Sequence, residues 1–217
     1  EIDPDLPWPQ IVERLKADHP PTDGVLEMYQ NEVTTSRRFV KEQDLVTMPE
    51  DEGFWVEWVP PFMWATLPFH ASYPPRPFED GNRGFWRITP PDPDASPEEQ
   101  EQKLRGHNRW NARALAMHEG YPGHHMHYCL LKQLPSKIRR QFTDPILVEG
   151  WALYTEELMW EKGFFEDPRG RLIQLVNALW RAVRVVAGVS MHTRGMTVDE
   201  AADMLVNVSR LGPTNAR

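Results

Sequence analysis

Hydrophobic residues recur with the 3.6-residue period of an α-helix over most of this chain. Proline or a capping residue opens several of these stretches, and glycine follows two of them, which sharpens their limits. The clearest start is Ser96-Pro97, where an N-cap, a first-turn proline and two acids follow one another. The predicted helices cover residues 9–17, 24–46, a long segment from 97 into 114–131, then 137–142, 146–162, 168–192 and a last helix capped by Thr197.

The second quarter of the chain has a different pattern, rich in aromatic and β-branched residues. Residues 54–59 (FWVEWV) and 84–89 (GFWRIT) have the composition of strands, and residues 65–73 can form another extended segment. Pro60-Pro61 ends the first strand, and residues 79–82 carry a turn signal. Short strands among many helices predict a mainly α (α+β) fold with a small irregular sheet beside the long helix.

Length and composition are typical of a single globular domain. The chain has 217 residues, enough to bury a sizeable core. We expect residues 1–47 to form N-terminal helices, 48–95 the sheet and loops, and 96–217 a helical part that carries the chemistry. The chain starts at Glu1 without an initiator methionine, which predicts a processed product or a fragment of a longer chain.

Charge and cysteine usage narrow the classes of partner. The formal net charge is −8, which argues against nucleic acid because a basic face is the expected footprint of nucleic-acid binding. We find no signal peptide and no apolar run long enough to span a bilayer, so we expect no membrane segment. The one cysteine, Cys129, excludes an internal disulfide. The compartment, cytoplasmic or exported, and the oligomeric state stay open.

Half of the histidines gather in residues 114–131 (ALAMHEGYPGHHMHYCLL), beside the acid Glu119. The four histidines of this segment are His118, His124, His125 and His127. Apolar residues flank them, and polar groups in such surroundings are costly unless something compensates them. A metal ion is the commonest compensation, because neutral imidazole is a good ligand for zinc. The alternative is a buried polar network without metal.

The spacing of the histidines does not fit a regular zinc-binding helix. In the HExxH pattern the second histidine stands four residues after the first, but here that position is Pro122. On a regular helix His124 would point about 120° away from His118, and His125 would lie some ~10 Å along the axis. Pro122-Gly123 is expected to break or bulge the helix. A bulge of one or two residues makes His124 the second ligand, with His125 as the fallback.

A catalytic zinc usually has three protein ligands and a water. Glu149 is the candidate for the third, because its apolar neighbours make a surface position hard to explain. Glu156, seven residues on, lies on nearly the same helix face and is a partner of a ligand or an alternative ligand. Glu119 would be the general base, taking a proton from a water on the metal and giving it to a leaving amine.

Other polar residues have less specific interpretations. His192 stands near a helix end, where the helix dipole favours a histidine. Arg184 can pair with a buried acid, and Tyr121 can donate a hydrogen bond to an oxyanion or simply pack. His107 and Arg105 are expected on the surface.

Two motifs resemble a known family. HEGYPGHH (118–125) and VEGWALYTEEL (148–158) look like the bacterial domain of unknown function family 885, which is similar to the gluzincin metallopeptidases. Softer matches cover residues 73–88 and 184–197, so the resemblance spans roughly the last 150 residues, the C-terminal part of the chain. It implies a helical fold, one zinc ion, His118, His124 and Glu149 as ligands, and Glu119 as the base. His192 would then contact substrate or an oxyanion, and Arg184 matches a recurring position.

The sequence therefore predicts a zinc-dependent hydrolase, a metallopeptidase acting on a peptide or small amide. The alternatives are a metal-dependent amidase on a non-peptide substrate, and a truncated, inactive domain with a structural metal. Structural sites use four protein ligands, so the ligand count separates these classes. The sheet edge near residues 64–73 or 84–89 is expected to align an extended peptide by strand addition.

Overall fold

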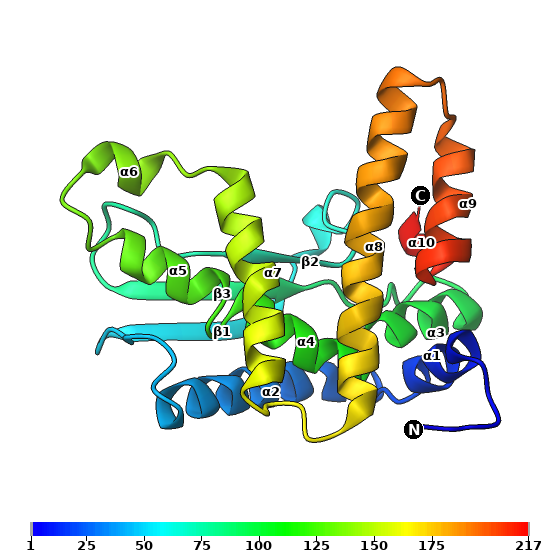
Figure 1. The fold of residues 1–217 in the computed structure, drawn as a ribbon, viewed down its shortest axis with the longest axis horizontal. Helices are drawn as coiled ribbons and strands as arrows, with labels where there is room; N and C mark the ends of the chain where they lie inside the picture. Colours follow the sequence, from blue (N-terminus) through cyan, green and yellow to red (C-terminus); the bar gives the residue numbers. More distant parts are fainter. Residues whose placement is uncertain (1, 217) are drawn as a thin grey trace. The chain divides into compact units, whose positions relative to one another are not determined.

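The computed structural model describes residues 2–216, with the backbone alone at residues 214 and 215. Helices dominate, and three strands form one small sheet, so the predicted mainly α (α+β) fold is confirmed (Figure 1). The chain divides into two compact units, each built from separate stretches of sequence. Unit 1 comprises Glu1–Thr22, Pro91–Asn111 and Asp167–Arg217, and unit 2 comprises Asp23–Pro90 and Ala112–Glu166.

Unit 2 contains the whole sheet. Its strands are β1 (Glu52–Trp58), β2 (His70–Tyr73) and β3 (Asn82–Ile88), with a short 3-10 helix η1 (Pro61–Met63) after β1. The order is β1-β3-β2, with β1 parallel and β2 antiparallel to β3. The 84–89 prediction thus describes the central strand and not an edge, because β3 is paired on both sides. β2 is the edge strand nearest in sequence to the predicted site.

Unit 2 also contains helices. They are α2 (Thr22–Glu42), α4 (Arg109–Glu119), whose first residues belong to unit 1, α5 (His124–Leu131), α6 (Lys137–Gln141) and α7 (Pro145–Glu161). Alternate residues of β3 are buried, and Trp86 among them packs edge-on against Tyr29 of α2, with ring centroids 4.8 Å apart. Burial of one such side chain contributes roughly 1.5–3 kcal/mol. Arg113 of α4 donates a 2.9 Å hydrogen bond to the buried Glu32 of α2, which fixes α4 in this unit.

Unit 1 is helical, with α1 (Trp8–Lys16), α3 (Pro97–Gly106), α8 (Pro168–Thr193), α9 (Val198–Ser209) and α10 (Pro213–Ala216). Its core joins the predicted apolar face of α1 to Trp110 and to Ile173 of α8. Capping boxes start α3 and α9: Ser96 pairs with Glu99, and Thr197 pairs with Glu200. These starts lie where the sequence predicts them, because capping side chains satisfy the free N–H groups of a first turn.

The predicted long helix from 97 into 114–131 is wrong, because α3 ends at Gly106 and α4 begins at Arg109. Asn108 makes the break, since its Oδ1 accepts from the backbone N–H of Asn111 at 2.9 Å, as a helix-capping side chain does. His107 between the two helices is fully buried, so its predicted surface position is also wrong.

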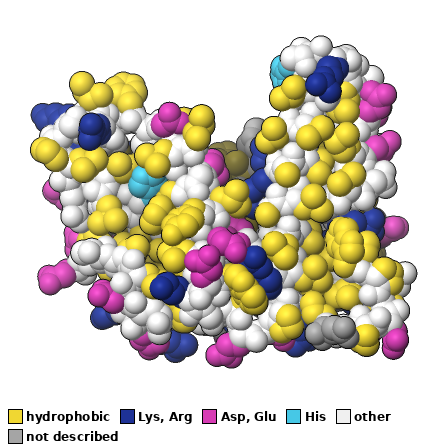
Figure 2. All heavy atoms as spheres, in the orientation of Figure 1, with side chains coloured by type: hydrophobic (Ala, Val, Ile, Leu, Met, Phe, Trp, Pro, Cys, Tyr) yellow, Lys and Arg dark blue, Asp and Glu magenta, His cyan; other side chains and the backbone are white. Residues whose placement is uncertain are grey.

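The helix α8 corrects the expectation that no apolar run is long enough to span a bilayer. By length and composition alone, its 26 residues could cross a membrane, with a mean hydropathy of 1.4 in the most apolar window. Its first half enters the core of unit 1 through Ile173, as a core helix of a soluble protein also would. Farther along, Val185 and Val189 are more than half exposed, and Figure 2 shows apolar side chains on the surface of this helix.

Candidate metal centre

The predicted interruption at Pro122-Gly123 is confirmed. α4 ends at Glu119 and α5 begins at His124, with a tight turn between them. Gly123 passes so close to the end of α4 that its N–H donates a 2.9 Å hydrogen bond to the Met117 carbonyl. A Cβ atom at position 123 would lie 1.9 Å from the carbonyl oxygen of His118, so only glycine fits without a backbone shift. The turn brings the start of α5 back against the last turn of α4.

The structure brings His118, His124 and Glu149 together, as predicted. One potential ligand atom from each lies within 4.8 Å of the others. Glu149 stands between the imidazoles: its Oε2 is 3.6 Å from His118 Nε2, and its Oε1 is 3.6 Å from His124 Nε2. The imidazole rings are nearly perpendicular, with centroids 4.8 Å apart. α4, α5 and α7 each supply one member.

Glu156 is a partner of His118, which is one of its two predicted positions. Its Oε1 accepts a 2.8 Å hydrogen bond from His118 Nδ1, and both side chains are buried. Burial alone would lower the pKa of His118, but the neighbouring carboxylates of Glu149 and Glu156 outweigh this effect and raise that pKa to about 9. The Nδ1 bond orients the ring so that Nε2 faces Glu149, an arrangement that holds metal-ligating histidines in many proteins.

Glu149 is more exposed than its apolar neighbours suggest. Its side chain is 66% exposed, and Ile146 and Leu147 in the same first turns of α7 are exposed too. The inference that its apolar neighbours make a surface position of Glu149 hard to explain is therefore wrong. The imidazoles of His118 and His124, each 3.6 Å from a carboxylate oxygen, hold the pKa of the Glu149 carboxyl well below its usual range. The carboxylate thus lies at the mouth of the site, with the imidazoles beneath it.

A pocket of about 290 Å³ opens over these donors, and Glu119 lines it beside them. Two residues of β2 that the sequence analysis missed, His70 and Ser72, line it as well. His70 Nδ1 lies 3.7 Å from Glu119 Oε1. The alternation of side chains along an extended segment places residues 70 and 72 on one face, and this signal was available in the 65–73 prediction.

His125 and Tyr121 face a different group. His125 is fully buried, and its Nε2 lies 3.3 Å from Glu52 Oε2 on β1, while the Tyr121 hydroxyl donates to the same carboxylate. Arg37 adds a 2.7 Å bond to the other oxygen of Glu52. The His125 imidazole and the Tyr121 hydroxyl both contact the Glu52 carboxylate. The geometry therefore does not support His125 as the fallback metal ligand or Tyr121 as a donor to an oxyanion. Sequence reasoning also missed Glu52, 73 residues before its histidine partner.

His192 and Arg184 lie on α8 in unit 1, so their predicted roles stay predictions. His192 is exposed, and its Nδ1 lies 2.7 Å from the Gly188 carbonyl oxygen one turn earlier. Arg184 is exposed as well and stacks on Trp180, with its guanidinium carbon 5.2 Å from the ring centroid.

The donors of the centre fit zinc. Two ligands on one tetrahedral zinc lie about 3.4 Å apart, since Zn–N and Zn–O bonds are about 2.0–2.1 Å long. The observed 3.6 Å separations from Glu149 to each imidazole are close to that value. Two histidines and one carboxylate are also a usual set for a catalytic ion. Within residues 2–216, no fourth histidine, cysteine or acid joins this group.

The fold and this site define a mainly helical α+β protein with a three-donor histidine–carboxylate cluster. The chain belongs to the family described as bacterial protein of unknown function (DUF885), whose model matches residues 5–217. The match extends the resemblance seen in the sequence, which covered only the C-terminal part, to nearly the whole chain.

Two solved structures have the same fold. The first is a protein of unknown function from Shewanella oneidensis, predicted to be a lipoprotein, with a TM-score of 0.79 and 25% identity. The second, from Colwellia psychrerythraea and also predicted to be a lipoprotein, has a TM-score of 0.71 and 22% identity. Each match covers 96% of this chain but only 37% of the other, so this chain spans little more than a third of those proteins. No curated protein matches this chain.

Proposed function

We propose that this protein is a zinc-dependent hydrolase of peptide bonds with a gluzincin-like metallopeptidase centre. The observation that carries the proposal is the convergence of His118, His124 and Glu149 in one pocket, with Glu119 lining the same pocket. Three protein donors leave a coordination position for a reactant, whereas structural zinc sites use four. The donor count among the described residues therefore favours a catalytic over a structural metal.

In this proposal, separate residues bind the metal, transfer the proton and position the other side chains. A zinc ion held by the three donors would polarise a substrate carbonyl and lower the pKa of a water molecule. Glu119 accepts the proton of the attacking water at its carboxylate and later delivers it to the leaving nitrogen, which general acid–base catalysis requires. Glu156 keeps His118 oriented through the 2.8 Å bond to Nδ1. His70 stands beside Glu119 and helps to position its carboxylate.

The edge strand β2 supports a peptide as the substrate. Its residues 70–72 line the pocket, and in the sheet order only one side of β2 is paired. An extended peptide can add to the free side by main-chain hydrogen bonds and so bring its carbonyl into the pocket. This is the sheet-edge alignment that we predicted for residues 64–73.

A larger cleft of about 1150 Å³ adjoins this pocket and shares Pro74 and Tyr128 with it. We propose that it receives the substrate residues on one side of the scissile bond. Basic side chains outnumber acidic ones among its lining residues, which favours acidic substrate side chains. The basic residues are Arg76, Arg83, Arg87, Lys132 and Arg140.

The test combines metal analysis with a Glu119→Gln variant assayed on a peptide library. We expect stoichiometric zinc in both proteins, cleavage by the wild type, and a loss of about 10²–10⁴-fold in rate for the variant. Glu161→Gln on the exposed surface of α7 is the matched control and should keep full activity. Wild-type protein without stoichiometric metal would refute the centre. Metal in both proteins with cleavage by neither would favour the structural alternative, and cleavage of non-peptide amides alone would favour the amidase.

A further inference from the structure

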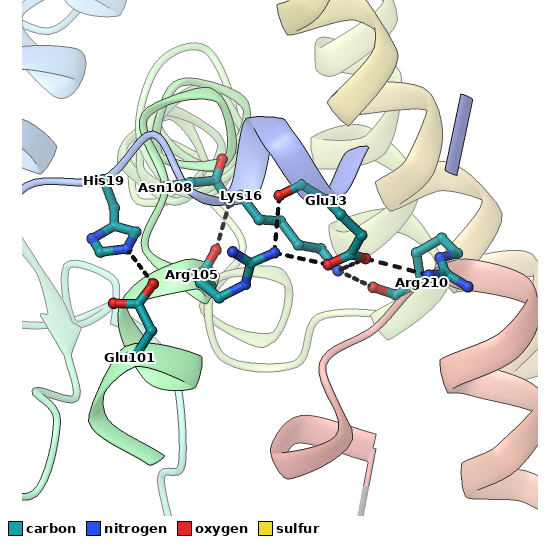
Figure 3. Close-up of polar contacts among 7 residues, drawn as sticks. All are labelled: Glu13, Lys16, His19, Glu101, Arg105, Asn108 and Arg210. Atoms are coloured by element: carbon teal, nitrogen blue, oxygen red, sulfur yellow. Dashed lines mark hydrogen bonds and ion pairs between the residues drawn. The ribbon is translucent and has the colours of Figure 1, made fainter. Parts of the chain in front are cut away.

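A second charged cluster belongs to unit 1 and shares no residue with the metal centre of unit 2. Glu13 and Lys16 come from α1, Arg105 from α3, and Arg210 directly follows α9 (Figure 3). All three basic side chains converge on the single carboxylate of Glu13 (Figure 3). Lys16 Nζ lies 3.0 Å from Oε1, Arg105 donates at 2.8 Å to Oε2, and an Arg210 nitrogen lies 3.5 Å from Oε1.

The cluster carries an excess of two positive charges. Three cations share one anion, and the Lys16 and Arg105 side chains are only 18% and 20% exposed, so water screens them poorly. Burial lowers the pKa of Lys16, and the charges of Arg105 and Arg210 lower it further against the opposing effect of Glu13. Arg105, predicted to be a surface residue, therefore belongs to a half-buried cationic group.

These cations border an open cavity. It has a volume of about 260 Å³ and is lined by Lys16, Arg105 and Arg210 together with Gln102 and the Gly212-Pro213 turn. The Nε–H of Arg210 is buried and has no hydrogen-bond partner among the residues whose side chains the structure describes. A buried donor without an acceptor is costly, and an anion in the cavity would provide one. Arg210 also has a positive φ of 59°, which is uncommon for a residue other than glycine.

We propose that this cavity is a binding site for a small phosphate-bearing ligand. A phosphate group carries close to two negative charges at neutral pH, which matches the excess of the cluster. Arginine guanidinium groups bind phosphate through paired N–H donors, and lysine adds a point charge. The volume exceeds that of inorganic phosphate, so the cavity has room for a small organic phosphate. The site does not depend on the proposed hydrolase activity.

The test measures binding of inorganic phosphate to the intact chain by calorimetry, with sodium chloride holding the ionic strength constant. We expect saturable binding, weakened at least tenfold by Arg210→Gln, because a hydrogen bond to a charged group contributes about 1.5–3 kcal/mol. Arg14→Gln is the matched control: Arg14 is on α1 beside Glu13, but it is 69% exposed and paired with Asp3. Equal weakening by both variants, or no saturation at millimolar phosphate, would overturn the proposal.

A second variant, expected to strengthen phosphate binding, keeps the test valid if Arg210→Gln does not fold. Glu13→Gln leaves three cations without their carboxylate, so phosphate should bind more tightly and raise the unfolding temperature of this variant more than that of the wild type. An unchanged phosphate effect on Glu13→Gln would contradict the site. Succinate, a dicarboxylate, is measured at the same ionic strength to test whether the site prefers phosphate to carboxylate. Tighter binding of succinate than of phosphate would refute the assignment to phosphate.

Discussion

Replacement of Gly123 by alanine is the most direct test of the turn that builds the candidate metal centre. The new Cβ would lie 1.9 Å from the His118 carbonyl oxygen and 2.3 Å from that of Met117. Both are backbone atoms, so no side chain can rotate away. The end of α4 and the start of α5 would have to separate by about an ångström or more, a typical overpacking strain.

The expected cost follows from this geometry. Overpacked sites usually lose 1–3 kcal/mol, and a clash with two backbone carbonyls belongs at the upper end, about 3 kcal/mol. For a chain of this size that loss lowers the unfolding temperature by about 6–12 °C. The same separation would move His124 relative to His118, so zinc affinity should fall as well.

Thermal unfolding and zinc titration of Gly123→Ala measure both effects. The matched control is Gly150→Ala, one residue from Glu149 on α7, where an added Cβ meets nothing within 4 Å. A helical glycine replaced by alanine gains about 0.5–1 kcal/mol, so the control should be more stable than the wild type. A Gly123→Ala protein with wild-type stability and wild-type zinc affinity would refute the reasoning about the turn.

Two further perturbations test the partners of the histidines. Glu156→Gln should weaken zinc binding by about tenfold, measured by competition with a chelator, because second-layer partners of metal-binding histidines typically contribute that much; an unchanged affinity would show that the bond to His118 Nδ1 is incidental. Glu52 has a pKa below its ordinary value because hydrogen bonds from His125, Tyr121 and Arg37 outweigh burial. Its ionised form therefore stabilises the fold above the ordinary glutamate pKa, and this contribution is lost as the pH falls through the lowered value. Denaturant unfolding between pH 7 and acid should show a steeper loss for the wild type than for Glu52→Gln, and parallel curves would contradict this.

Local signals account for the features that the sequence predicted well. Ser96, Asp144 and Thr197 each cap a helix at the expected place, since their side chains accept from backbone N–H groups of the first turn. The break at Pro122-Gly123 also follows from local chemistry, because proline removes a donor and glycine permits close approach. His118 and His124 could be predicted as a pair because the Pro122-Gly123 break lies between them, whereas the correct choice of Glu149 is explained by the resemblance of residues 148–158 to the family motif.

The features that were missed depend on distant parts of the chain. Glu52 meets His125 across 73 residues, and Glu119 on α4 meets His70 on β2. No local pattern encodes either pairing. The exposure of Glu149 was misjudged because apolar neighbours were taken as a sign of burial, although Ile146 is 84% exposed itself. Isolated exposed apolar residues are common on protein surfaces, so the inference from neighbours was weak.

The two adjacent histidines of α5 contact different carboxylates from different sides of the helix start. His124 faces Glu149, and His125 faces Glu52, because successive helical residues point about 100° apart. The position of α5 must therefore satisfy both contacts at the same time. Insertion or deletion of one residue before His124 would rotate both imidazoles away from their partners. The number of residues in the turn between α4 and α5 is therefore what both contacts depend on.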